Sequence, residues 1–149
     1  MSLQTKAFDA QDQLVTLLDA QAGLDGWTVA FGLPAAREEK HLWVDEQVEE
    51  WTQGEQSTGI VTKDEAFTLS VFIYVRRTGA DAQEIRDEIK AAAGIVASVI
   101  GTQPFLGGSV MYASIVSGEY DGAFADAEGR AREGVLNLKI GCLAFLSGA

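Results

Sequence analysis

The sequence is poor in the residues that carry most enzymatic and metal chemistry. It contains a single cysteine, Cys142, and a single histidine, His41. It therefore holds neither an internal disulfide nor the His/Cys set of a usual transition-metal site. It also lacks the G-x-x-x-x-G-K-[ST] and G-x-G-x-x-G loops that bind phosphates, and His41 has no serine or cysteine at a spacing typical of nucleophilic catalysis. We expect no enzymatic activity, no cofactor and no bound metal.

Positive charge and long apolar runs are also scarce. Eleven lysines and arginines face 22 acidic residues, for a net charge of −11. Nucleic-acid phosphates and anionic membrane surfaces are repelled by such a protein, although DNA can slide past its surface without sticking. No apolar run approaches the roughly 20 residues of a membrane span, and no basic-then-apolar signal pattern opens the chain. We expect a protein that folds in a reducing cytoplasm and does not bind membranes.

Two adjacent segments form the centre of the predicted fold. Residues 65–77 alternate as a strand, and because Phe72 and Tyr74 lie on its second face, both faces are predicted to be covered, as in a central strand. Residues 81–100 show helical spacing, with Asp81 and Glu84 placed to cap the start. The apolar helical stripe consists of Ile85, Ile89, Ala92, Val96 and Val99.

The remaining pattern predicts a helix over residues 7–20 and strands over 27–31, 41–44, 109–116 and 135–146. Trp27, Trp43 and Cys142 fall in alternating strands, where packing in the core is the expected role. The order of elements predicts one α+β domain spanning residues 1–149, a single mainly antiparallel β-sheet packed by one or two long α-helices, with long charged loops.

Two segments are interpreted as these charged loops. Residues 45–65 are strongly acidic with a single lysine, and we interpret them as strand ends joined by a mobile loop that carries Trp51 as an isolated aromatic; a solvated hairpin is the alternative. Residues 117–134 form the second loop. A rigid body with two charged loops and no catalytic apparatus indicates an assembly protein. A small-molecule-binding α+β domain is the alternative if Phe72, Tyr74 and Met111 line an open cavity.

The succession of segments resembles the tail terminator (tail completion) proteins of long-tailed phages. The matching features span most of the chain: Gly26–Pro34 as a strand and turn, the Trp-containing strand 41–44, Glu65 leading into the central strand, Gly79 before the helix from Asp81, Leu106–Val110 opening a strand, and Gly129 before the closing strand.

This resemblance implies a homo-oligomeric ring, typically hexameric, located in the neck or tail of a virion assembled in the host cytoplasm. Its partners would be the tail tube protein and the head–tail connector, with DNA passing through the lumen without specific binding. Other virion ring components, a connector subunit or a tube protein, are the alternative.

Two sets of candidate site residues follow from this resemblance and from the charge pattern. The first is a tube- or lumen-facing set around the lone aromatic of the acidic segment: Glu46, Glu49, Glu50, Trp51 and Glu55. The second is a subunit or connector interface in the other charged segment: Glu128, Arg130, Arg132 and Glu133. Exposed ion pairs there contribute a few tenths to about 1 kcal/mol each, and a loop with purely local pairs is the alternative.

Overall fold

The computed structural model describes residues 4–35, 39–57 and 61–146. Within these ranges the chain forms two α-helices, two 3₁₀ turns and a six-stranded sheet, so the α+β fold class is confirmed. The elements in order are α1 (Ala7–Asp19), η1 (Ala22–Leu24), β1 (Thr28–Phe31), β2 (Lys40–Val44), β3 (Glu49–Ser57), β4 (Val61–Thr78), α2 (Ala82–Thr102), η2 (Leu106–Gly108), β5 (Tyr112–Phe124) and β6 (Ala131–Leu146).

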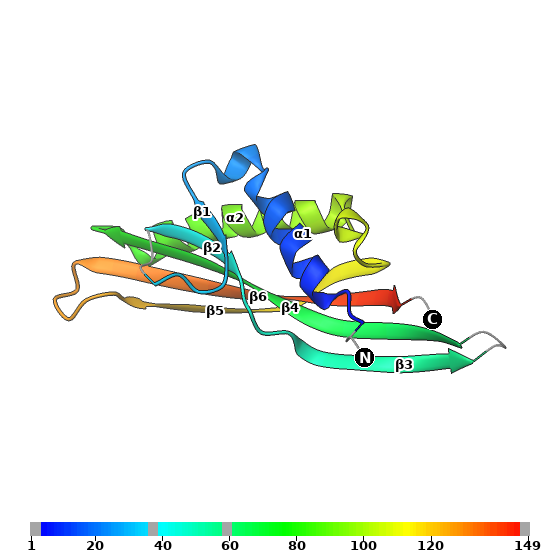
Figure 1. Ribbon diagram of the computed structural model, residues 1–149. Coiled ribbons are helices and arrows are strands. Elements are labelled where there is room, and N and C mark those ends of the chain that lie inside the picture. Colours follow the sequence, from blue (N-terminus) through cyan, green and yellow to red (C-terminus); the bar gives the residue numbers. More distant parts are fainter. Residues whose placement is uncertain (1–3, 36–38, 58–60, 147–149) are drawn as a thin grey trace.

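The sheet is built around β4. The strand order is β1-β2-β4-β6-β5, and β3 pairs with β4 beyond the end of β2. Antiparallel pairing with β6 runs from Lys63↔Leu146 to Thr78↔Ala131, and only β1 and β2 pair in parallel among the described strands. The expected central strand is thus confirmed. Both helices lie on one face of the sheet, and no described helix covers the opposite, open face (Figure 1).

The core lies between the sheet and the two helices. The apolar series of β4 expected to face inward is buried there, as is the predicted stripe of α2. The α2 N-terminus is capped as the sequence predicts, because the Asp81 carboxylate accepts a hydrogen bond of 2.8 Å from the Glu84 backbone N–H. α1 contributes its own buried face, made of Ala7, Ala10, Leu14 and Leu18.

The two segments interpreted as long loops are mostly paired strands. Residues 49–57 and 61–78 form the β3–β4 hairpin, which was the alternative for the first segment, so the mobile-loop interpretation is wrong. β5 continues to Phe124 and pairs with β6 from Ser117↔Lys139 to Phe124↔Arg132. The glycines and acids of this stretch oppose strand formation, but continuous backbone pairing with β6 overrides that preference.

Of the three residues expected in the core, Cys142 lies there, whereas Trp27 and Trp43 have other surroundings. Trp27 is only half-buried, and Lys40 Nζ lies 5.9 Å from its ring centroid. Trp43 is buried, yet it stacks on Phe72 with ring centroids 5.1 Å apart, on the face of the sheet opposite the helices. Cys142 is buried in the core, and this burial raises the pKa of its thiol to about 12.

Candidate assembly surfaces

A buried carboxylate ties the start of the chain to the base of the β3–β4 hairpin. Glu65 is fully buried, and its Oε2 accepts hydrogen bonds from Thr5 Oγ1 (2.7 Å), Trp51 Nε1 (2.7 Å) and Gln53 Nε2 (2.9 Å). Its Oε1 accepts a further bond of 2.7 Å from the Lys6 backbone N–H. Burial raises the pKa of Glu65, but these donors outweigh it and hold the pKa below the ordinary value of 4.5.

Trp51 belongs to this buried network and is not an isolated surface aromatic. Its indole nitrogen is bound to Glu65, and its ring meets Phe8 of α1 edge-on at 5.8 Å. The side chain is half-buried on the helix side of β3. Its structural role is to attach the hairpin to α1, so the expectation of an isolated aromatic is wrong.

The acidic residues predicted to accompany Trp51 do not form one cluster. Glu46 is exposed in the connection between β2 and β3. Glu49 is bound to Lys139 at 2.6 Å on the open face of the sheet. Glu50 is exposed at an irregularity in β3, where its φ of 48° and the register shift re-aim the strand. Glu55 lies in β3, but its side chain falls outside the described part.

The second predicted set is divided between a turn and the two faces of β6. Glu128 and Arg130 form a local ion pair of 3.3 Å in the exposed connection between β5 and β6. Arg132 places its guanidinium 4.1 Å from the ring centroid of Phe124 on the helix side. Glu133 points to the opposite face, where it accepts a hydrogen bond of 2.7 Å from Tyr74 Oη. Tyr74 and the stacked Phe72 are therefore engaged with neighbours, which does not support the cavity that a small-molecule site would require.

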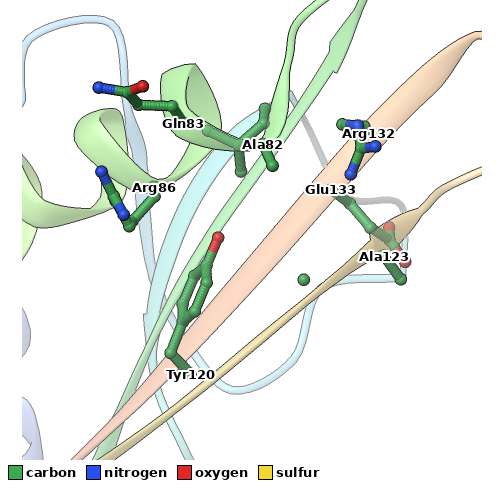
Figure 2. A pocket seen from close by; sticks show the side chains of 9 residues that line it. Ala82, Gln83, Arg86, Tyr120, Ala123, Arg132 and Glu133 are labelled. Atoms are coloured by element: carbon green, nitrogen blue, oxygen red, sulfur yellow. The ribbon is translucent and has the colours of Figure 1, made fainter.

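An open cavity of about 440 Å³ lies between the first turns of α2 and the adjoining ends of β5 and β6. Gln83 and Arg86 approach it from α2, Tyr120 rises from β5 with its hydroxyl toward the helix, and Arg132 reaches it from β6 (Figure 2). In a chain of net charge −11, this cavity is notable because two arginines line it against one acidic residue, Glu133.

The outer edge of β5 is the most apolar exposed surface of the sheet. β5 is the last strand in the order, with β6 as its only strand neighbour in the described part of the chain. It is 13 residues long and exposes Tyr112, Ile115, Val116, Tyr120 and Phe124. Leu143 and Phe145 extend the apolar surface onto β6, beside a hollow of about 410 Å³ that Tyr112 and Val116 also line.

Sequence reasoning missed Glu65, Arg86 and Tyr120 as site residues. A signal for Glu65 was present, because residue 65 shares its strand parity with the buried series Phe67, Leu69 and Val71. A carboxylate on that face has to be buried and must therefore find donors. For Arg86 and Tyr120 no such signal exists, since the pairing of β5 with β6 brings them together across a long stretch of sequence.

Comparison with known proteins gives little. No family model matches the chain, and no curated protein matches it. One solved structure, a chain from the virion of a native gene transfer agent particle, is similar over 94% of this chain and 100% of that chain, with 13% identity and a TM-score of 0.45. No described helix is long and apolar enough to cross a membrane, and the described residues contain no group of three or more His, Cys, Asp or Glu placed to hold a metal ion.

Proposed function

We propose that this protein is a non-enzymatic structural component of a phage-like virion that closes into a homo-oligomeric ring of the tail terminator type. Such a ring caps the tail tube, ends its polymerisation and joins the tail to the head connector. The observation that carries the proposal is the long apolar edge of β5, which offers unpaired backbone groups together with exposed aromatic and aliphatic side chains. An edge of this kind invites pairing with another chain.

The amount of exposed surface supports assembly. The molecule exposes 8506 Å². A compact monomer of 15.9 kDa is expected to expose roughly 7,350 Å². The excess fits a long sheet that carries helices on one face only (Figure 1). A long half-covered sheet reaches an ordinary surface-to-volume ratio when neighbouring subunits cover it.

The two sides of the sheet differ, as a ring requires. One lateral edge of the sheet is formed by β5, whereas the opposite edge is formed by the short β1 and by β3. A contact between unlike patches is heterologous, and it closes into a ring when the rotation between subunits permits. Identical edges would instead favour a two-fold dimer.

The charge fits passage of DNA through such a ring. At −11, the subunit gives an assembled lumen a negative potential that repels phosphates, so DNA passes without adsorbing. Within the proposed function, Glu46, Glu49, Glu50 and Glu55 with Trp51 mark the region that faces the tube or the lumen. Glu128, Arg130, Arg132 and Glu133 mark the subunit or connector side.

The test is native mass spectrometry of the purified protein, with negative-stain images of the same sample. We expect closed rings with a central hole, and expect these rings to stop the growth of tubes when tail tube protein is added. Val116→Lys, which places a charge on the exposed β5 edge, is expected to abolish the rings, whereas Thr16→Lys on the outer face of α1 leaves them intact. A wild-type chain that stays monomeric both alone and with tube protein contradicts the proposal.

Another virion ring component, a connector subunit or a tube protein, would display the same edge. The two functions differ in where the ring sits and in what added tube protein does. A ring that extends into a tube by itself identifies a tube protein. A ring that binds the head side of the neck but leaves the growth of the tail tube unchanged identifies a connector.

A further inference from the structure

The cavity below α2 is lined by two arginines, and within the described residues only Arg86 has a carboxylate at ion-pair distance. Arg132 has Phe124 beneath its guanidinium, and among the described residues no carboxylate lies within ion-pair distance of it. Arg86 makes only a 3.7 Å contact with its exposed neighbour Asp87. The Tyr120 hydroxyl adds a hydrogen-bonding group at the centre of the cavity (Figure 2).

The nearby acids are already engaged elsewhere. Glu88 binds Arg77 at 3.0 Å and Lys40 at 3.7 Å, and Glu84 lies 3.9 Å from Arg77. Glu133 turns its carboxylate to the opposite face, toward Tyr74. Glu133 also lines the cavity, but its carboxylate is taken up by the Tyr74 hydroxyl, so within the described residues Arg132 has no carboxylate partner.

Two exposed acids lie level with the cavity along the strand direction, but at the opposite lateral edge of the sheet, near β1 and β2. The registers connect Gly122 of β5 to Gly134 of β6, Gly134 to Val75 of β4, and Val75 to Lys40 of β2. Glu39 directly precedes β2 at this level, because its carbonyl accepts from the Arg76 backbone N–H.

Asp25 is the second of these acids, in the turn that leads into β1. Both side chains are exposed, and within the described part of the chain neither forms an ion pair. When copies meet side to side with their strands running in the same direction, this end of one copy lies against the cavity of the next.

We propose that the cavity below α2 receives carboxylates of a second copy of this chain, with Asp25 and Glu39 of one subunit bound by Arg86 and Arg132 of its neighbour. The inference rests on the ring assembly proposed above and names the polar contact that fixes its direction. The apolar β5 edge supplies contact area, and the charge pairing sets the register and excludes the reversed arrangement. Because every subunit repels every other by its net charge, a local pairing of opposite charge favours contact where they touch.

The test uses two charge-reversed variants of the full chain. The cavity variant carries Arg86→Glu and Arg132→Glu, and the edge variant carries Asp25→Lys and Glu39→Lys. Each variant alone places like charges across the contact, so we expect each to shift its assembly midpoint to at least about tenfold higher concentration. Mixed in equal amounts they restore opposite charges at every contact of an alternating ring, and we expect rings at the wild-type midpoint. Lys90→Glu, an exposed reversal on the outer side of α2, is the control and is expected to assemble normally.

The outcomes separate the possible explanations. If net charge alone governed assembly, the less acidic edge variant would assemble better than the wild type, which overturns the inference. Wild-type rings together with normal rings of the cavity variant also overturn it, while leaving the proposed function standing. A wild-type chain that forms no ring removes both proposals. Circular dichroism of each variant monomer verifies the fold, and a cavity variant that is unfolded is replaced by Arg86→Gln with Arg132→Gln, for which a smaller loss of assembly is expected.

Discussion

The two long hairpins of this molecule extend to opposite ends of the sheet and use their charges in opposite ways (Figure 1). At the β3–β4 end, Glu65 is buried and accepts hydrogen bonds from four residues of the same chain. At the β5–β6 end, Glu128, Arg130 and Arg132 are partly or largely exposed; Glu128 and Arg130 form a surface ion pair, and Arg132 lies over the Phe124 ring.

This contrast shows that charged, glycine-bearing segments of similar composition serve different purposes. A buried carboxylate with its donors in place fixes one arrangement of the chain, since leaving any donor unpaired is costly. Exposed charges contribute little to the fold and remain available for a partner. The β3–β4 end is therefore expected to govern stability, and the β5–β6 end to govern assembly.

The largest expected effect is that of Glu65→Ala. Removing the carboxylate leaves Trp51 Nε1, the Lys6 N–H and two further donors without their acceptor in a buried site, and we expect a loss of about 3 kcal/mol in the free energy of unfolding. Urea denaturation followed by tryptophan fluorescence measures it. Glu128→Ala at the opposite hairpin is the matched control, and a similar loss in both variants would remove the contrast between the two ends.

Gly134→Ala tests how tightly the β5–β6 hairpin is held under α2. A Cβ at this position would stand 2.6 Å from Tyr120 Oη, 2.8 Å from Ile85 Cγ2 and 2.9 Å from Ile89 Cδ1. Overpacking of this kind costs roughly 1–3 kcal/mol. Gly94→Ala is the control, because a Cβ there meets nothing within 4 Å and α2 should gain up to about 1 kcal/mol from the better helix former. A neutral Gly134→Ala would show that the helix and strand separate easily at this end.

Acid should weaken the β3–β4 end specifically. The pKa of Glu65 is lowered in the folded state, so its stabilising contribution is fully present above the ordinary value of 4.5 and is lost as the pH falls through the folded value. We expect Glu65→Gln to flatten this part of the curve of unfolding free energy against pH. The measurement is urea unfolding at a series of pH values on either side of the ordinary value. Parallel curves for the wild type and the variant would mean that protonation of Glu65 does not affect the free energy of unfolding.

The centre of the fold was predictable because its signals are local. The alternation of β4 and the stripe of α2 each follow from a period within one segment, and Asp81 with Glu84 is a cap three residues apart. The extent of β5 was not predictable, since Gly118, Asp121 and Gly122 oppose a strand locally and only the partner β6 holds them in one.

The sequence predicted some of the residues of the candidate surfaces, but not which face of the sheet each side chain occupies. The sequence singled out Arg132 and Trp51, but strand alternation decides which face each side chain occupies. In β3 the irregularity at Glu50 interrupts that alternation. The cavity depends on α2 passing over β5 and β6, which are distant in sequence, so Arg86 and Tyr120 gave no signal.

The smallest expected effect concerns the ion pair between Glu128 and Arg130. The side chains are 64% and 74% exposed and 3.3 Å apart, so water screens their attraction and ordering them costs side-chain entropy. A double-mutant cycle of Glu128→Ala and Arg130→Ala is expected to give a coupling below about 0.5 kcal/mol in the monomer. A coupling above about 1 kcal/mol would mean that this pair holds the connection between β5 and β6 in place, as Glu65 holds the opposite hairpin. The two ends would then differ in degree only, and the charges of the β5–β6 end would be part of the fold and not a surface left free for assembly.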